Sequence, residues 1–261
     1  MRILITNDDG ITAPGLAVAE AIAADLAGPD GEVWVVAPAF EQSGVSHCIS
    51  YIHPMRLEQI GERRFAVEGS PADCVLAGLN EVLTDTPPDL VLSGVNRGHN
   101  VAEDTLYSGT VGGAMEGALN RARSIAMSQY FTPDSLKSDD PFAAARAHGA
   151  PLIRKLLDNA RWHDQHYGVF YNINFPGVPA DAIKGVRATV QGARGASTFG
   201  IEPQTAPNGR RFLWITHGRG NADTAPGTDS RDCHDGHVTV TPLRADLTAH
   251  EMVEPLARAI A

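Results

Sequence analysis

The pattern of apolar and polar residues alternates between strand-like and helix-like spacing through the first 160 residues. Short β-rich runs predict strands at 2–6, 32–37, 88–94 and 124–128. Helical spacing or helix-start signals (Pro14, Ser70, Pro71) predict helices at 14–27, 69–83, 108–120 and 141–160. Strands that alternate with helices indicate the α/β class, with a mainly parallel sheet and helices on both faces.

Strand-like runs also occur without helices between them. The runs 47–52 and 63–67 predict a hairpin or meander. From about residue 167, further runs at 168–176, 185–190, 211–218 and 237–243 are separated by segments rich in Gly, Pro, Asn and Asp, with a turn-rich loop at 221–236 and a last helix near 249–260. The sequence therefore predicts one domain over 1–261, in which about 167–261 contribute a C-terminal β-hairpin extension and a terminal helix that could serve as arms in oligomers.

Composition and charge narrow the function classes. The chain is 43% hydrophobic and 20% charged, as in an ordinary globular protein. A net charge of −10 argues against binding to nucleic-acid polymers and to anionic membrane surfaces. No apolar run approaches the length that crosses a bilayer. Small anionic substrates remain compatible with this charge, because a metal ion or a helix N-terminus can hold them.

The cysteines and the first residues bear on the compartment. Cys48, Cys74 and Cys233 are widely spaced and odd in number, which fits a reducing compartment. Met1 leads directly into the first predicted strand, with no basic segment, long apolar segment or cleavage site, so no signal peptide is expected. These features predict a soluble, cytoplasmic protein.

Polar side chains follow three of the predicted strands at the point where each strand ends. Asp8 and Asp9 follow the first strand, Ser43 the second and Asn96 the third. Ligands bind at the carboxyl ends of the strands in open α/β sheets, so these residues are expected to meet. The two carboxylates repel each other, which calls for a positive group beside them. An all-oxygen donor set suits Mg²⁺, Mn²⁺ or Ca²⁺, although Asp-Asp-Gly alone is also favourable turn chemistry.

The segment YSGTVGG, at 107–113, opens a predicted helix. The hydroxyls of Ser108 and Thr110, with the backbone N–H groups of Gly109 to Val111, could cradle a phosphate at the helix N-terminus. An ordinary serine N-cap would produce the same pattern. Neither GxxxxGK[ST] nor GxGxxG occurs in the chain, which argues against a P-loop and against a dinucleotide cofactor.

Seven segments occur in one order over essentially the whole chain: ILITNDDGITAPG, EQSGVSH, GSPADCV, PDLVLSGVNRGHN, YSGTV, YNINFP and ADLTAHE. Together they resemble the survival protein E (SurE) family of metal-dependent nucleotidases. Two departures stand out. Ala39 and Phe40 follow VAP where the family usually has an acidic residue, and Ala102 stands where the family commonly has glycine. Neither departure removes a predicted ligand, so they concern substrate preference and loop conformation.

The resemblance implies a Rossmann-like core and a homodimer or homotetramer assembled through swapped C-terminal elements. It implies a 5′-nucleotidase, a phosphoric monoester hydrolase acting on nucleoside 5′-monophosphates. Nucleoside 3′-monophosphates are a further substrate class, and some members also trim short polyphosphate. One divalent ion per subunit, Mg²⁺ or Mn²⁺ with Ca²⁺ as the alternative, would be held by Asp8, Asp9, Ser43 and Asn96.

The residues leave the mechanism open. A phosphate would bridge the metal and the Ser108–Thr110 segment, with Asn96 touching both. One aspartate could orient or deprotonate the attacking water, or Asp8 could form an aspartyl-phosphate.

Weaker candidates lie elsewhere in the chain. His250, four residues after Asp246, is a candidate general acid, and a solvated or capping histidine is the alternative. Arg97 and His99 are candidate neighbours of the substrate, against a solvated loop. Thr228 and Asp229 could close over the site from the second half. Cys233, His234 and His237 lack the second ligand pair that a zinc site needs, and they are interpreted as turn and strand-start chemistry.

Two other classes of protein remain as alternatives. Receiver domains also hold Mg²⁺ with an acidic pair after the first strand, but they are about half this length and need a phosphoacceptor Asp after the third strand and a Lys after the fifth. Here Asn96 follows the third of these strands, and the run at 124–130 offers no Lys. A non-catalytic nucleotide-binding protein is the other alternative. Catalytic turnover would separate an enzyme from both.

Overall fold

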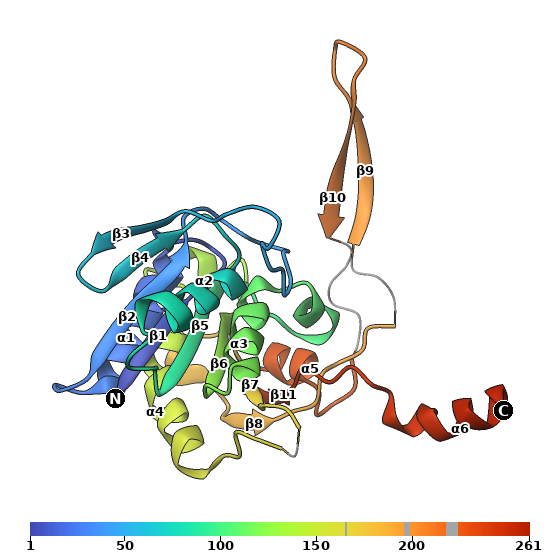
Figure 1. Cartoon of the computed structure of the whole chain (residues 1–261). Coiled ribbons are helices and arrows are strands. Elements are labelled where there is room, and N and C mark those ends of the chain that lie inside the picture. Colours follow the sequence, from blue (N-terminus) through green and yellow to red (C-terminus); the bar gives the residue numbers. More distant parts are fainter. Residues whose placement is uncertain (165, 196–198, 218–223) are drawn as a thin grey trace.

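A sheet of nine strands forms the body of the protein in the computed structural model, which describes residues 1–164, 166–195, 199–217 and 224–261 (Figure 1). The strand order is β3-β4-β2-β1-β5-β6-β7-β11-β8. The strands are β1 (Arg2–Thr6), β2 (Glu32–Pro38), β3 (Leu57–Gly61), β4 (Arg64–Val67), β5 (Leu90–Arg97), β6 (Ser124–Gln129), β7 (Phe170–Phe175), β8 (Val186–Ala188) and β11 (Val238–Leu243). All neighbours pair in parallel except β3 with β4 and β7 with β11, as the prediction of a mainly parallel sheet requires.

Side chains of the central strands alternate between two buried layers. In β1, Ile3 and Ile5 belong to one hydrophobic cluster and Leu4 to another. Neighbouring β5 does the same, with Leu92 in the first cluster and Val91 in the second. Because successive residues of a strand face opposite sides, both faces of the sheet must be covered. This explains why these runs are almost wholly apolar rather than alternating with polar residues.

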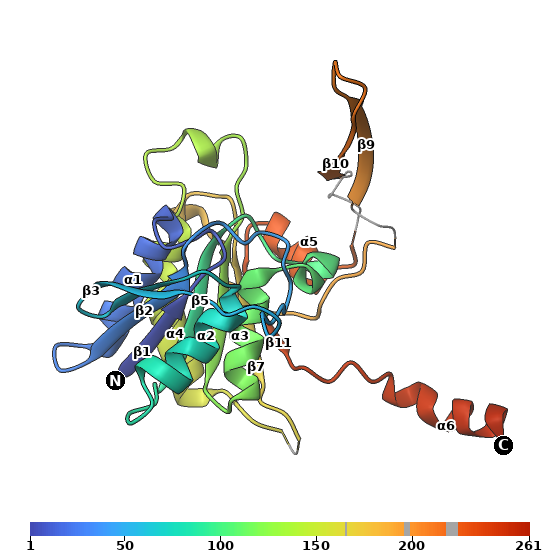
Figure 2. The same ribbon diagram turned by 45° about the horizontal axis from the view of Figure 1, so that its top comes forward.

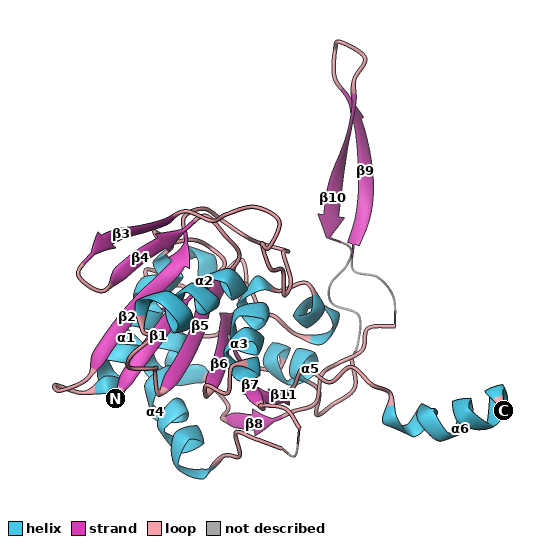
Figure 3. Ribbon diagram, viewed as in Figure 1, coloured by secondary structure: helices cyan, strands magenta, loops and turns pink. Residues whose placement is uncertain are grey.

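Four helices provide that cover (Figure 3). Helices α1 (Pro14–Ala27) and α4 (Ala143–Asn159) pack with the first cluster, and α2 (Pro71–Ala77) and α3 (Gly109–Leu119) cover the other face. Ser70 caps α2 as expected, because its side chain accepts from the Asp73 N–H at 3.1 Å while Asp73 accepts from the Ser70 N–H at 2.8 Å. The prediction of helices on both faces is confirmed.

The run at 47–52 is not a strand. Its backbone groups bond to the start of α2 instead: the Ser50 N–H donates to Asp73 at 2.9 Å, and the Cys48 carbonyl accepts from the Ser70 hydroxyl at 2.5 Å. The hairpin beside the parallel strands is formed by β3 and β4, so its first strand begins ten residues later than the predicted run.

Two further elements differ from the sequence prediction. Strand β9 (Phe199–Thr205) was not predicted because Gly200 and Pro203 interrupt its pattern, yet it pairs with β10 (Arg211–His217) across an Asn208-Gly209 turn. Within the loop predicted at 221–236, of which 221–223 lie outside the described residues, helix α5 (Asp229–His234) forms. The Thr228 hydroxyl caps α5 by accepting from the Arg231 N–H, and Gly236 follows at φ +92°.

The β9–β10 hairpin and α6 (His250–Ile260) extend away from the body in different directions (Figure 2). Every residue of α6 is exposed. We call these two segments the arms. No helix of the described ranges is long and apolar enough to cross a membrane.

Candidate functional site

Three loops meet at the carboxyl ends of β1, β2 and β5. The Gln42 N–H donates to the Asp8 carbonyl oxygen at 2.7 Å, which ties the loop after β2 to the loop after β1. The Arg97 N–H donates to the Asp9 carboxylate at 2.9 Å, which ties in the end of β5. Ser43 and Asn96 are the chain neighbours of these two donors. The loops that carry all four predicted metal ligands are therefore held together by direct hydrogen bonds.

Asp8 lies against the N-terminus of α3. Its carboxylate accepts from the Thr110 hydroxyl at 2.5 Å and from the Thr110 N–H at 3.1 Å. This approach requires glycine at position 109, because a Cβ there would lie 2.9 Å from the Asp8 Cβ. The Ser108 hydroxyl accepts from the Val111 N–H at 3.1 Å and so caps the helix. The structure thus brings the predicted phosphate segment to Asp8, while the phosphate contacts themselves stay a prediction.

Burial raises the pKa of both aspartates. Asp8 is only 4% exposed, and burial raises its pKa to about 6, with the neighbouring Asp9 charge adding to the effect against the bonds from Thr110. Burial also raises the pKa of Asp9, although the Arg97 N–H and charge oppose the rise. No side chain of the described residues forms a salt bridge with Asp8. A cation bound here would offset the cost of ionising both carboxylates.

The surrounding donors fit a hard divalent cation. Ser43 is exposed and its hydroxyl donates to Glu41 at 2.9 Å, while the Asn96 amide nitrogen donates to the Gly98 carbonyl at 2.9 Å. The amide oxygen of Asn96 carries the acceptor capacity that a cation needs. No group of three His, Cys, Asp or Glu residues that could hold a metal occurs in the described part of the chain. A cation site formed by side chains at this edge therefore needs hydroxyl or amide oxygens beside the two carboxylates, as in the predicted set.

His99 faces α5. Its Nε2 lies 3.2 Å from the His234 Nε2, and the Tyr130 ring stacks near-parallel on both imidazoles at 4.4 and 4.8 Å. Burial, with the adjacent His234, lowers the pKa of His99 to about 4, so this imidazole is neutral near pH 7. Arg97 has an exposed side chain and contributes its backbone N–H to Asp9. These contacts give His99 a role in joining the loop after β5 to α5, which the sequence did not indicate.

Asp246 and His250 form a pair of their own, with 2.5 Å between the carboxylate and Nε2. The pair lies at the start of the outlying α6, and the hydrogen bond from His250 holds the pKa of Asp246 well below its usual range (Figure 1). Within one chain this position gives no support to a general-acid role for His250, which stays a prediction.

Asp229 is a supporting residue whose contacts the sequence did not reveal. Its buried carboxylate accepts from the N–H groups of Ala102, Gly192 and Ser230, at 3.1, 2.8 and 2.7 Å. It therefore fastens the loop after β5 to the second half of the chain. The only hint in the sequence was Gly-Thr-Asp, a combination that also fits an ordinary turn.

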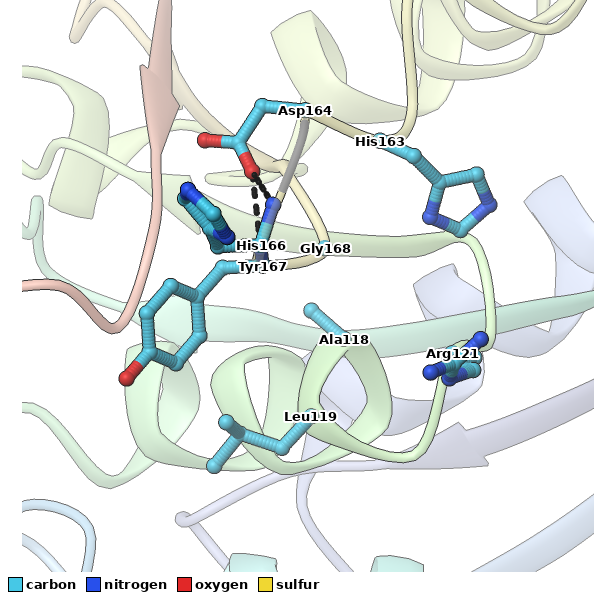
Figure 4. A pocket seen from close by; sticks show the side chains of 8 residues that line it. All are labelled: Ala118, Leu119, Arg121, His163, Asp164, His166, Tyr167 and Gly168. Atoms are coloured by element: carbon cyan, nitrogen blue, oxygen red, sulfur yellow. Dashed lines mark hydrogen bonds between the residues drawn. The ribbon is translucent and has the colours of Figure 1, made fainter.

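A hollow at the opposite end of α3 is separate from this edge of the sheet (Figure 4). Leu119 and Arg121 line it from the end of α3, and His163 and Tyr167 from the segment before β7. None of the residues predicted for the site lies there.

Comparisons with known proteins agree with this architecture. The family model described as "Survival protein SurE" matches residues 3–198. The chain is similar to proteins named 5′-nucleotidase SurE from Ruegeria pomeroyi, at 61% identity over 98% of both chains, and from Jannaschia sp., at 58% identity over 100% of both. It also resembles the crystal structure of a SurE protein from Aquifex aeolicus, with a TM-score of 0.82, 33% identity and 100% coverage of both chains. The chain belongs to the SurE family.

Proposed function

We propose that this protein is a 5′-nucleotidase that hydrolyses nucleoside 5′-monophosphates with the help of one divalent cation. The observation that carries the proposal is the meeting of Asp8, Asp9 and the loops of Ser43 and Asn96 at the N-terminus of α3. The names of the relatives from Ruegeria pomeroyi and Jannaschia sp. support the activity. Neither alternative class gains support, because the matched family is not one of receiver domains and the relatives are named as enzymes.

The cation, Mg²⁺ or Mn²⁺ with Ca²⁺ as the alternative, would be held by Asp8, Asp9, Ser43 and Asn96. When bound, it would polarise a phosphoryl oxygen and offset negative charge. Thr110 fixes the Asp8 carboxylate and the Arg97 N–H fixes that of Asp9, so both groups are positioned before substrate binds. Both Asp8 oxygens accept hydrogen bonds from Thr110, so these contacts favour a role for Asp8 in holding the cation. Asp9 would then orient the attacking water.

The same proposal covers two further classes of substrate. Hydrolysis of 3′-monophosphates and of short polyphosphate requires only that the phosphoryl group reach the same edge of the sheet. The predicted cytoplasmic location has no bearing on this chemistry and stays a prediction.

The arms support assembly with a second copy of the chain. Met252, Val253, Leu256 and Ile260 are exposed along α6, and Phe212, Leu213 and Trp214 are exposed on β10. Apolar surface of this extent usually marks an interface. A homodimer or homotetramer would cover these faces, with residues from about 167 to 261 supplying the arms.

Phosphate release from a panel of nucleoside 5′- and 3′-monophosphates tests the proposal. The metal-stripped chain would be assayed with Mg²⁺, with Mn²⁺ and with EDTA, beside Asp8→Asn and Asn96→Ala. We expect catalytic turnover that EDTA and both substitutions abolish. Cation binding without turnover on any nucleotide would overturn the proposed activity and favour a binding protein.

A further inference from the structure

A hollow of about 380 Å³ opens beside the loop that carries Ser43. Phe40 and Val45 line it from the loop after β2, and Glu68, Gly69 and Ser70 line it from the turn between β4 and α2. Its volume falls within the range of about 300–1,000 Å³ that is typical of small-molecule sites. Its lining combines an apolar wall with polar groups, as such sites do.

This hollow, which we call the Phe40 hollow, is connected to the loop of Asp8 through one of its lining residues. Gln42 lines it and donates its N–H to the Asp8 carbonyl at 2.7 Å. On the other wall, Ser70 precedes Pro71, and a Cβ on Gly109 would lie 3.1 Å from the Pro71 Cγ and 2.9 Å from the Asp8 Cβ. Asp8 is therefore linked to one wall through Gln42, and to the other through Pro71, the chain neighbour of Ser70. A molecule whose phosphate lies beside Asp8 would have the hollow next to it.

Phe40 is the feature that suggests what occupies the hollow. Its side chain is 68% exposed, although it lies in a loop packed closely against Gly10, where an added Cβ would lie 3.3 Å from the Phe40 carbonyl carbon. The backbone of Phe40 thus packs against Gly10 while the ring stays accessible. Accessible aromatic rings are the groups on which proteins stack nucleobases.

We propose that the Phe40 hollow is the nucleobase subsite and that Phe40 stacks on the base of the nucleotide. This inference rests on the proposed nucleotidase function and adds a specificity-determining residue to it. Purines present a larger face than pyrimidines, so stacking on Phe40 favours purine nucleotides. The carboxylate of Glu68 supplies an acceptor for amino groups of the base.

Kinetics of Phe40→Ala test the inference, with AMP, CMP and ribose 5-phosphate as substrates. We expect KM for AMP to rise about 10-fold, KM for CMP to rise less, and KM for ribose 5-phosphate to stay unchanged, because that substrate has no base. Phe40→Tyr should restore the wild-type KM. Tyr51→Ala is the matched control, because Tyr51 is exposed on the same loop outside the hollow. An equal change for all three substrates, or none for AMP, would overturn the inference.

Cys48 provides a readout that does not depend on turnover. It lines the hollow and is exposed, whereas Cys74 and Cys233 are buried. We expect adenosine to slow modification of Cys48 by N-ethylmaleimide in the wild type and not in Phe40→Ala, and inorganic phosphate to leave the rate unchanged. Modification at the same rate with and without adenosine would contradict a base subsite. A chain that hydrolyses no phosphate ester but shows this protection would disprove the nucleotidase while supporting the subsite.

Discussion

The body of the protein and its arms use apolar residues in opposite ways. In the body, strands such as β1 and β5 bury every apolar side chain between two helical layers. In the arms, α6 and β9–β10 expose theirs: Trp214, Ile215, Met252 and Leu256 are each more than half exposed. The body therefore satisfies its own packing within one chain, and the arms do not.

This difference separates the site from the proposed assembly. Asp8, Asp9 and Thr110 are fixed by hydrogen bonds within the body, and none of these bonds involves the arms. A cation should therefore bind to each chain at an edge that is formed before assembly. Changes in the body should affect chemistry and stability, while changes in the arms should affect association.

The largest effect is expected at Asp8. Asp8→Asn removes a buried carboxylate from the proposed cation site, and kcat/KM for a nucleoside 5′-monophosphate should fall by about 10³-fold or more. The circular dichroism spectrum should stay that of the wild type, because Asn can still accept from the Thr110 hydroxyl. Retention of a tenth of the wild-type activity would remove Asp8 from the catalytic machinery.

Next in size is a core substitution in β5. Leu92 is fully buried between the sheet and α1, so Leu92→Ala should lower the free energy of unfolding by about 2–5 kcal/mol. Urea denaturation followed by tryptophan fluorescence would measure this loss. A cost below about 0.5 kcal/mol would mean that the described packing is wrong at this strand.

The effect of pH on cation binding is expected to be smaller than the effects of these two substitutions. Since the pKa of Asp8 is raised to about 6, the metal-free folded chain keeps its proton at pH values where the unfolded chain has lost it. Protonation therefore stabilises the metal-free fold at low pH, and this contribution is lost as pH rises from about 4 through 6.

Cations compete with that proton, so Mn²⁺ affinity should fall about tenfold per pH unit below 6 and level off above it. Calorimetric titrations between pH 5 and 8 would show the change in slope. An affinity independent of pH over that range would place the cation away from Asp8.

The smallest effect on stability is expected in α6. Leu256→Asp introduces a charge into the exposed apolar face and should change the unfolding free energy of the body by less than about 0.5 kcal/mol. Light scattering after size-exclusion chromatography should nevertheless show a smaller assembly than for the wild type. Arg258→Ala, an exposed change in the same helix, serves as the control and should leave the assembly intact. A wild-type assembly in Leu256→Asp would show that α6 is not an interface.

The sequence predicted elements that carry a local pattern better than contacts and elements that depend on distant partners. The runs 2–6 and 14–27 carry their own apolar patterns, with Pro14 at the start of the second, and the structure places β1 and α1 at those same bounds. The run at 47–52 has strand-like residues but bonds to Ser70 and Asp73, which are distant in the sequence. Strand β9 forms because it pairs with a partner strand across a turn. The local sequence pattern, which Gly200 and Pro203 interrupt, does not reveal this pairing.

The sequence predicted those parts of the candidate site that are formed by local motifs. Asp8, Asp9, Ser43 and Asn96 follow successive strands, and parallel strands bring such positions to one edge. The contact of Asp8 with Thr110, the bonds of Asp229 to Ala102 and Gly192, and the stack of His99, Tyr130 and His234 join residues that are 31 to 135 positions apart. Only the folded chain reveals which of these distant groups meet.

Mn²⁺ titration of the metal-free, full-length chain tests most directly whether the acidic edge of the body holds a cation. Isothermal titration calorimetry at pH 7.5 would compare the wild type with Asp8→Asn and with Leu256→Asp. We expect one ion per chain in the wild type, the same stoichiometry and affinity in Leu256→Asp, and no measurable binding in Asp8→Asn. Wild-type binding in Asp8→Asn would contradict the cation site and, with it, the proposed role of the paired aspartates.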